Sequence, residues 1–418
     1  MTIVQIDPSS LTDYQHRLIT RIVDALRPDP VRLVGGFIRD NLLGVPVQDI
    51  DFATPLLPEE VMERLHKADI RVVPTGLSHG TVSAIVDNKA YEITTLRRDI
   101  VSDGRHAKVV YTDDWQEDAQ RRDFTINALF ADPVSFEVYD YFDGLADLKE
   151  SKVRFIGSAE KRIAEDYLRI LRFFRFSARF CNGPYDLEAL RACHRQRHGM
   201  QRLSGERVRE ELMSIFRMEK ITACCQQMVD YGIVQELFPA MQEVALSILN
   251  GLLRLERALA ISVCPLRRLG SIIPHDSPDV FPAIAERLKF SNKDRGRWHA
   301  LMTDREKEGL PSEQQLSGLV FEQGYDRVQN WLLYHAVWQE NGDFIHLLRC
   351  LEKYRNWSPP SFPIKGGDLI ARGLPAGPKV GKTLAAIRSE WIARQFPLDD
   401  KTLDRMIASH LPHKKEGG

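Results

Sequence analysis

Two aspartates, one residue apart, are the first side chains in this sequence that could perform chemistry. Asp49 and Asp51 lie in the stretch DIDFAT (49–54). If this stretch is a strand, side chains at i and i+2 point to the same face, so the two carboxylates lie close together. Two like charges at close range are costly unless a cation lies between them, and Mg²⁺ binds carboxylate oxygens. The pair therefore indicates either a magnesium site or an acidic strand edge without a ligand.

The residues just upstream favour the metal site. Gly35 and Gly36 follow the apolar run VRLV (31–34) and precede a helical pattern, FIRDNLLG, that ends at Gly44. Backbone N–H groups at the start of a helix are a ready binding site for anions. Arg39, one turn into that helix, can bind a phosphate through two of its N–H groups. An anion site beside metal-binding carboxylates is what a nucleoside triphosphate with magnesium requires.

Together these residues resemble the nucleotidyltransferase head of the DNA polymerase β superfamily, and within it the class II tRNA nucleotidyltransferase and poly(A) polymerase family. The resemblance extends over roughly the first 220 residues. Its further motifs, in order, are HGTVSAIVDNKAYEITTLRRD (79–99), DGRHAKVVYT (103–112), RRDFTINALF (121–130), DGLADL (143–148), EDYLRILRFFRF (165–176) and LSGERVREEL (203–212). Chance does not produce so many unusual motifs in the family's order.

The resemblance implies roles for the matching residues of the first motifs. Asp49 and Asp51 would hold catalytic Mg²⁺, and Glu92 is either a third carboxylate of that site or a surface acid. Two metal ions would activate an RNA 3′-hydroxyl and stabilise the departing pyrophosphate. The Gly-Gly pair and Arg39 would hold the triphosphate.

The motif RRDFT supplies Arg122 and Asp123, which in the family contact the nucleotide and select ribose. An arginine suits a phosphate, and a carboxylate suits a 2′-hydroxyl donor. Asn127 is placed to support that site. A capped helix with a buried Phe124 is the structural alternative, and both interpretations can hold together.

Asp166 and Arg169 in EDYLR lie three residues apart, which places them on one face of a helix. Cytosine and adenine each present an amino donor beside a ring-nitrogen acceptor, whereas uracil and guanine present a carbonyl beside a ring N–H. An Asp that accepts and an Arg that donates therefore fit C and A, and leave polar groups unpaired against U and G. The resemblance implies the same kind of recognition, because enzymes of the family read the base with the protein and without a nucleic-acid template.

Further arginines follow at helical spacing. Arg172 and Arg175 continue the stripe in steps of three, and Arg179 lies further along. The resemblance implies that they belong to the nucleotide pocket. A solvated arginine face is the alternative, above all for Arg179.

The elements that must position these residues predict an α+β fold. A helix near 14–27 and β-rich runs at 70–75, 81–86 and 90–96 suggest a mixed β-sheet with helices, and long helical patterns take over after about residue 155. The helix in 204–216 begins at Ser204. The predicted domains are a nucleotidyltransferase head (1–150), a helical neck that reads the base (151–220), a helical body (221–357) and a helical tail that binds tRNA (358–418).

Charge is unevenly distributed. The whole chain has a net charge of −1, but residues 151–220 hold 16 Lys and Arg against nine Asp and Glu. A basic segment in an otherwise acidic chain suits a polyanion, because Lys and Arg that neutralise phosphates release counterions. A solvated helical face is the alternative.

The chain reads as a soluble cytoplasmic protein. Six cysteines are scattered without C-x-x-C spacing, which is typical of reduced thiols. No apolar run is long enough to cross a membrane, and the N-terminal residues lack the pattern of a secretory signal.

A phosphate-loop pattern near the end is interpreted as a decoy. AGPKVGKT (376–383) fits a relaxed version of the motif, but GGDLIARGL before it is helical rather than a strand, and Pro378 removes an N–H group that the loop needs. A Gly-Pro turn that starts a helix is expected instead, with Lys379 or Lys382 available to an RNA phosphate.

The predicted function is CCA addition: Mg²⁺-dependent transfer of C, C and A from CTP and ATP to the 3′ end of tRNA. No membrane and no protein partner is implied. Alternatives are a poly(A) polymerase, a CC-adding enzyme and a catalytically silent tRNA-binding protein. The chain lacks a strongly basic C-terminal extension, residues 97–120 are long enough for a switch from C to A, and Asp49, Asp51 and Arg122 are all present. These features favour CCA addition.

Overall fold

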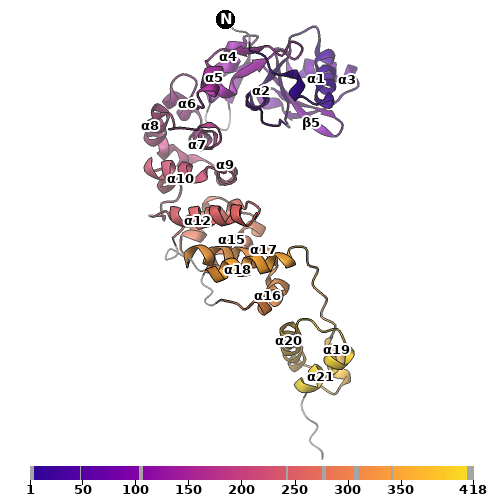
Figure 1. Ribbon diagram of the computed structural model, residues 1–418. Helices are drawn as coiled ribbons and strands as arrows, with labels where there is room; N and C mark the ends of the chain where they lie inside the picture. The colour runs from indigo at the N-terminus through magenta and orange to yellow at the C-terminus, as the bar shows by residue number, and fades with distance from the viewer. Residues whose placement is uncertain are drawn as a thin grey trace, which may run out of the picture. The chain divides into compact units, whose positions relative to one another are not determined.

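The computed structural model describes residues 4–47, 49–102, 107–241, 243–274, 279–305, 310–339 and 342–411 (Figure 1). The chain forms two compact units. The first comprises residues 1–242 and 282–289, and the second comprises residues 243–281 and 290–418. The predicted α+β class is confirmed, because the first unit contains a mixed sheet and the second is helical. The predicted division into head, neck, body and tail is finer than these units and stays a prediction.

The first unit is built on a seven-stranded sheet with the order β3-β4-β5-β2-β1-β8-β9. Only β2 and β5 pair in parallel, and the other neighbours are antiparallel. The strands are β1 (Arg32–Val34), β2 (Asp51–Thr54), β3 (Arg71–Gly76), β4 (Thr81–Val86), β5 (Lys89–Thr95), β8 (Leu129–Ala131) and β9 (Val138–Asp140). The predicted runs at 31–34, 70–75, 81–86 and 90–96 thus all form strands. Phe52 and Ile93 stand opposite each other in β2 and β5, and both are buried.

Helices cover this sheet and then continue as a helical region. The helices of the sheet region are α1 (Asp13–Leu26), α2 (Gly36–Leu42), α3 (Pro58–Lys67), α4 (Trp115–Gln120) and α5 (Gly144–Lys149). They are followed by α6 (Ala159–Glu165), α7 (Leu168–Phe180), α8 (Leu187–Gln196), α9 (Gly205–Ile215), α10 (Ile221–Asp230) and α11 (Ile233–Leu237). The short 3₁₀ helices of this unit are η1 (Pro8–Ser10), η2 (Leu77–His79), η3 (Thr125–Asn127) and η4 (Arg197–Arg202).

Helix α1 illustrates how local sequence sets these elements. Thr12 caps its start, and Gln15 returns a bond to the Thr12 backbone, which completes a capping box. Its buried side chains recur at three- and four-residue spacing from Leu18 to Leu26. The helix packs against α3, and α3 in turn packs on β3 and β4 (Figure 1).

The structure departs from the sequence patterns at two places. The capped helix considered as the alternative for RRDFT does not form: the stretch forms η3 followed by strand β8, although Phe124 is fully buried as expected. The helical pattern that includes EDYLRILRFFRF forms its long helix only from Leu168. Residues 97–120 contain the antiparallel strands β6 (Arg97–Ser102) and β7 (Ala107–Tyr111), and residues 103–106 lie outside the described residues. The helix starting after Ser204 is confirmed as α9.

The second unit consists of helices. They are α12 (Leu246–Ala258), α13 (Pro265–Ser271), α15 (Asn292–Arg305), η5 (Glu313–Gln315), α16 (Leu316–Gln323), α17 (Tyr325–Trp338), α18 (Gly342–Leu351), η6 (Glu352–Tyr354), α19 (Gly366–Ala371), α20 (Pro378–Ala393) and α21 (Asp400–His410). Residues of α14 (Val280–Arg287) fall in both units. One apolar core lies among α12, α16, α17 and α18, and another lies among α19, α20 and α21.

The phosphate-loop pattern is a decoy, as predicted. Helix α20 begins at Pro378 after Gly377, whose φ angle of 146° favours glycine. Helix α19 precedes it rather than a strand. In the part of the chain that the structure describes, no helix combines the length and apolar character needed to cross a membrane.

Candidate active site and a basic cavity

A cavity of about 510 Å³ in the first unit collects most of the predicted site residues. Nine of the twelve line it: Gly35, Gly36, Arg39, Asp51, Arg122, Asp123, Asp166, Arg169 and Arg172. Asp49, Glu92 and Arg175 do not. Six further residues complete the lining: Val34, Arg121, Asn127, Leu168, Phe176 and Arg207. Residues more than 150 positions apart in sequence therefore face one space.

The charges of Asp49 and Glu92 act on the carboxylate of Asp51 at the edge of this cavity. Asp51 in β2 and Glu92 in β5 are neighbours across the parallel strand pair, because Phe52 pairs with Ile93 one residue further on. Burial, followed by the charges of Glu92 and Asp49, raises the pKa of Asp51 to about 6. Such a set of oxygen donors fits a hard divalent cation, which would relieve the repulsion among them. Glu92 is not an isolated acid, because its charge contributes to the raised pKa of Asp51.

One of the two glycines does not offer the free N–H that the sequence suggested. The Gly35 N–H donates to the carbonyl oxygen of Leu129 at 3.0 Å, so the pairing of β1 with β8 uses it. Both glycines lie beside guanidinium groups. A Cβ at Gly35 would lie 3.6 Å from Arg122 Nη1, and a Cβ at Gly36 would lie 3.4 Å from Arg39 Nη2. Gly35 also has a φ of 70°, a conformation that favours glycine.

Arg39 is a buried cation at this wall. Its Nε donates to Asp40 at 2.8 Å, and its Nη1 donates to Asn127. Burial lowers the pKa of Arg39, and the adjacent Asp40 partly offsets that effect. Arg179 lies outside the cavity and pairs with the other oxygen of Asp40 at 3.0 Å. Arg179 therefore acts on the site through Asp40.

Asp118, which the sequence analysis missed, holds the two arginines that begin the RRDFT motif. It is buried, and its two oxygens accept bonds from Arg121 at 2.7 Å and from Arg122 at 3.0 Å. Burial alone would raise the pKa of Asp118, but Arg122 and Arg121 outweigh it and lower the pKa. The available clue was the helical spacing between Asp118 and these arginines.

Asp123 is committed to protein contacts. One oxygen accepts from the Phe124 N–H at 2.9 Å and from Asn127 Nδ2 at 3.0 Å, and the other accepts from Arg172 at 2.6 Å. Burial opposes its ionisation, but Arg172 and Asn127 hold the pKa of Asp123 below its usual value. In this arrangement Asp123 fixes the direction of Arg172 at the cavity wall.

Asp166 and Arg169 do share the cavity, although not on one helix as predicted. Asp166 has extended backbone, with φ −155° and ψ 107°, at the break between α6 and α7. Its side chain caps the next helix by accepting the Leu168 N–H at 3.1 Å. Arg169 stands in the first turn of α7, and its N–H bonds to the Asp166 carbonyl at 3.0 Å. The break still brings the acceptor and the donor to the same wall.

Helix α9 holds this wall from behind, a role that sequence reasoning did not assign. Arg207 donates to Asp166 at 2.7 Å. One turn later, Glu211 pairs with Arg175 at 2.7 Å and lies 3.7 Å from Arg172. The i, i+4 spacing of Arg207 and Glu211 was the available clue. Arg175, which was predicted to belong to the nucleotide pocket, instead forms an ion pair with Glu211 of α9.

Phe176 provides an aromatic surface inside the cavity. The guanidinium groups of Arg39, Arg172 and Arg175 lie 5.3, 5.4 and 4.5 Å from its ring centroid. At these distances each cation interacts favourably with the ring face. A phenylalanine that follows an FF pair at helical spacing is typical of a buried core, which is why the sequence did not mark Phe176.

We expect Arg207→Ala to weaken the use of CTP and ATP without preventing folding. Removing a charge-assisted hydrogen bond of this kind costs about 1.5–3 kcal/mol, or about 10- to 100-fold in kcat/KM. The loss should fall on both nucleotides, because Asp166 loses the bond that orients it. Steady-state kinetics on a tRNA substrate measure the effect.

Arg209→Ala is the matched control, since Arg209 lies on the same helix and donates to the Lys289 carbonyl, away from the cavity. Equal losses in the two variants would mean that α9 acts only through general stability.

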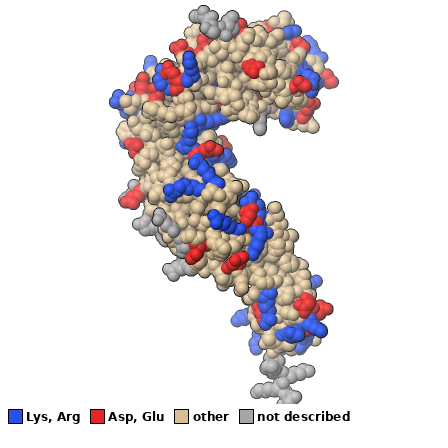
Figure 2. Space-filling model, viewed as in Figure 1, with Lys and Arg blue, Asp and Glu red and all other residues tan. Residues whose placement is uncertain are grey.

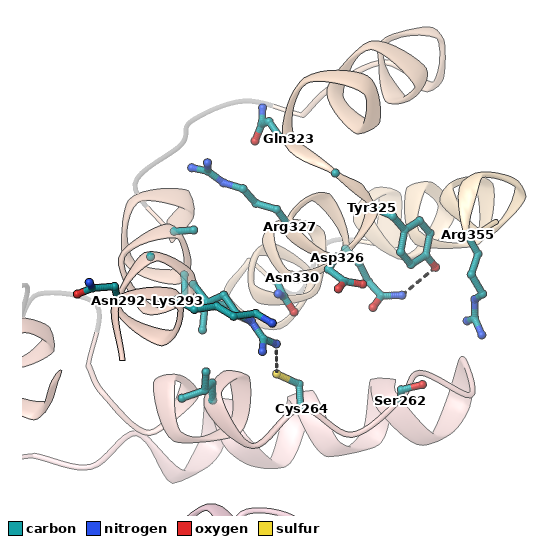
Figure 3. Close-up of a pocket in the computed structure, with 17 residues that line it drawn as sticks. Ser262, Cys264, Asn292, Lys293, Gln323, Tyr325, Asp326, Arg327, Asn330 and Arg355 are labelled. Atoms are coloured by element: carbon teal, nitrogen blue, oxygen red, sulfur yellow. Dashed lines mark hydrogen bonds between the residues drawn. The ribbon is translucent and has the colours of Figure 1, made fainter. Parts of the chain in front are cut away.

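The second unit contains a separate basic cavity of about 950 Å³ (Figure 3). Its basic side chains are Lys293, Arg297, Arg327 and Arg355, and its acidic side chain is Asp326. They come from α15, α17 and the end of η6. The other amide and hydroxyl groups of the lining belong to Ser262, Asn292, Gln323, Tyr325, Gln329 and Asn330. Figure 2 shows Lys and Arg side chains over this helical region, with acidic side chains among them.

The lining of the basic cavity has four cationic side chains and one acidic side chain. Arg297 donates to the sulfur of Cys264 at 3.7 Å. Arg327 donates to Thr303 at 3.4 Å, and Arg355 pairs with Glu352 at 2.5 Å. Tyr325 accepts a bond from Gln329 at 2.9 Å (Figure 3). A cluster of Lys and Arg with hydrogen-bonding neighbours suits phosphate groups.

Comparison with known proteins places these features in a family. Residues 31–154 match the poly A polymerase head domain, and residues 186–244 match the probable RNA and SrmB-binding site of polymerase A. The mitochondrial CCA tRNA nucleotidyltransferase 1 of mouse (Mus musculus) is 34% identical over 86% of this chain and 82% of that protein.

Solved structures agree in fold. The Bacillus stearothermophilus CCA-adding enzyme in complex with CTP has a TM-score of 0.73 at 22% identity, over 96% of this chain and 98% of that one. The Thermotoga maritima CCA-adding enzyme complexed with tRNA-CCA has a TM-score of 0.65 at 22% identity, over 98% and 100%. The resemblance inferred from the motifs is therefore confirmed, and the chain belongs to the family of class II CCA-adding enzymes and poly(A) polymerases.

Proposed function

We propose that this chain is a CCA-adding tRNA nucleotidyltransferase. It transfers C, C and then A from CTP and ATP to the 3′ end of tRNA and releases pyrophosphate. The observation that carries this proposal is one cavity in which an acidic strand edge, phosphate-binding arginines and an Asp/Arg pair meet. The names of the relatives, which include enzymes in complex with CTP and with tRNA, support it.

The proposed metal site consists of Asp51 with Asp49 and Glu92, and the proposed ion is Mg²⁺. When bound, it would activate the RNA 3′-hydroxyl and neutralise charge on the leaving pyrophosphate. An oxygen-only donor set with no nitrogen or sulfur ligand supports Mg²⁺ over softer metals.

The arginines of the cavity bind the triphosphate in this proposal. Arg122 is held by Asp118, and Arg39 is held by Asp40 and Asn127, so both guanidinium groups are fixed before the nucleotide arrives. Preorganised cations contribute more than mobile ones, because the site need not rearrange as charge develops. A third cation at this wall, Arg172, is directed by Asp123.

The base is read by Asp166 and Arg169. Each Asp166 oxygen accepts one bond, from the Leu168 N–H or from Arg207, and keeps further lone pairs for the nucleotide. Arg169 donates three bonds to the protein and keeps two of its five N–H groups for the nucleotide. A fixed acceptor beside a fixed donor matches the Watson–Crick edges of cytosine and adenine. One protein pocket can therefore serve both nucleotides.

We propose that the basic cavity of the second unit binds the phosphate backbone of the tRNA. Replacing Lys293 and Arg297 together by Ala is expected to weaken tRNA binding by about tenfold or more, and to lower the salt dependence of log K by about one for each lost contact. Filter binding over a salt series measures both. Asp326→Asn serves as the control of opposite sign, since removing the acid should tighten binding. An unchanged salt slope in the double variant would refute this assignment.

The proposed compartment is the cytoplasm. Its support is that all six cysteines are free thiols, as expected in a reducing environment.

The test of the proposed function is extension of a tRNA that lacks its terminal CCA, with Mg²⁺ and CTP, ATP or both, resolved on a sequencing gel. Addition of C, C and one A, followed by a stop, is the expected result. A stop after two Cs would identify a CC-adding enzyme, and a long ladder from ATP alone would identify a poly(A) polymerase. Binding without extension would point to a silent tRNA-binding protein.

A further inference from the structure

A cluster of three metal-ligating side chains lies in the second unit, and its members line neither of the cavities described above. His346 and Cys350 stand one turn apart on α18, and Glu313 stands on η5. Each residue offers one ligand atom: a ring nitrogen of His346, a carboxylate oxygen of Glu313 and the sulfur of Cys350. These three atoms lie within 4.8 Å of one another. Among the described residues, this is the one group of three or more such side chains at that spacing.

The distances within the cluster match a tetrahedral metal site. The sulfur of Cys350 lies 3.5 Å from His346 Nε2, and the same nitrogen lies 3.9 Å from Glu313 Oε2. Zinc binds sulfur at about 2.3 Å and imidazole nitrogen at about 2.0–2.1 Å, so tetrahedral angles separate these two ligands by about 3.6 Å. The His/Cys pair therefore already has the required spacing, and the carboxylate has to move closer to the histidine nitrogen.

The surroundings set the character of such a site. The side chains of His346 and Glu313 are 67% and 52% exposed, so the site is open to solvent and leaves a fourth position for water. Lys353 pairs with Glu313 at 3.4 Å and would have to turn away when a cation binds. It is half exposed, so the turn is sterically free. Partial burial and the Glu313 carboxylate raise the pKa of the Cys350 thiol, which a nearby cation would reverse.

We propose that Glu313, His346 and Cys350 form a binding site for a thiophilic divalent cation such as Zn²⁺, separate from the carboxylate site of the first unit. The two sites differ in donor chemistry: nitrogen and sulfur ligands select Zn²⁺, whereas an oxygen-only set selects Mg²⁺. A bound ion would link η5 to α18, one of the helices that form the apolar core of α12, α16, α17 and α18. It would stabilise this unit without taking part in nucleotide transfer.

Titration of the full-length protein with Co²⁺, which adopts the geometry of Zn²⁺ but absorbs light, tests the site. We expect one Co²⁺ per chain with a thiolate-to-cobalt charge-transfer band, and loss of that band when Zn²⁺ is added. Cobalt bound to the carboxylates of the first unit cannot give this band, because no thiol lies among them.

Cys350→Ser should abolish the band, and His346→Ala should weaken cobalt binding at least about tenfold. Cys264→Ser, which removes the other partly exposed thiol, should leave both unchanged. Serine is close in size to cysteine, and circular dichroism checks that each variant folds. Absence of the band in the unsubstituted protein, or its persistence in Cys350→Ser, would overturn the proposal whether or not the chain adds CCA.

Discussion

Asp51→Asn is expected to reduce nucleotide incorporation by about 10³-fold or more while tRNA binding stays within about twofold. Asparagine keeps the size of the side chain but removes the charge of Asp51, which lines the cavity whereas Asp49 and Glu92 do not. Loss of one catalytic metal ligand or of equivalent electrostatic stabilisation costs about 4 kcal/mol, which corresponds to about a thousandfold in rate. Binding of tRNA should survive, because the basic cavity of the second unit is untouched.

The stability of this variant should not fall. Burial and two neighbouring carboxylates make the charged form of Asp51 unfavourable in the free protein, so neutralising it relieves repulsion. Thermal unfolding without metal should therefore show Asp51→Asn to be at least as stable as the unsubstituted chain. This separates a catalytic defect from a folding defect.

Single-turnover incorporation of CTP, measured over a range of Mg²⁺ concentrations, tests the prediction. Asp24→Asn is the matched control, because Asp24 is exposed and pairs only locally with Arg27. Glu92→Gln in the same assay decides whether the third carboxylate is a ligand. Near-normal incorporation by Asp51→Asn at every Mg²⁺ concentration would remove the metal role from this strand.

The acidic strand and the sheet around it could be predicted because their determinants are local. DIDFAT alternates, GGFIRDNLLG has helical spacing and a terminal glycine, and the runs at 81–86 and 90–96 are rich in β-branched residues. The alternation survives folding, since Ile50 and Phe52 are buried, whereas Asp49 is exposed and Asp51 is partly exposed. Asp51 is at the cavity edge for that reason.

The errors arose where long-range pairing overrides local preference. The RRDFT motif allowed a capped helix, but Leu129–Ala131 just after it forms strand β8, because β1 and β9 offer it hydrogen-bonding partners on both sides. The same pairing uses the Gly35 N–H that the sequence assigned to an anion. The partners in β1, Leu33 and Val34, are distant in sequence from Ala131 and Phe130, and no local period contains them.

The supports of the site were also beyond local reading. Asp118, Arg207 and Glu211 lie on the elements α4 and α9, whose spacing is typical of ordinary amphipathic helices. Only packing reveals that their charges meet Arg122, Asp166 and Arg175. The basic cavity of the second unit is similar, since its cations come from three elements that share no motif.

Arg169→Ala is expected to lower the discrimination between CTP and UTP by about 10²-fold. A site that hydrogen-bonds a polar group rejects an analogue with the wrong pattern strongly, because buried groups are left unpaired. A hundredfold change corresponds to about 2.7 kcal/mol, which is one to two charge-assisted hydrogen bonds. The loss should come mainly from slower use of CTP, with UTP affected less.

The structure makes Arg169 suitable for this role because its guanidinium group is fixed on one side only. It donates to Glu165 at 2.5 Å, to the Arg162 carbonyl at 2.8 Å and to the Arg121 carbonyl at 3.3 Å. A guanidinium group has five N–H donors, so these three bonds leave two for a base. A fixed donor cannot rotate to suit uracil, whose matching position is itself an N–H donor.

Asp166→Asn provides the complementary measurement. An amide has both a donor and an acceptor, and it can flip, so this variant should accept UTP better than the unsubstituted enzyme does. Arg195→Ala is the control for lost charge in the same helical region, because Arg195 pairs with Glu160 on the surface. Kinetics for CTP and UTP on a tRNA without CCA give the ratio for each variant. If Arg169→Ala and Asp166→Asn both keep the original CTP to UTP ratio, the base is read by other groups of the cavity. A donor and an acceptor that contact the base cannot both be altered without changing the ratio.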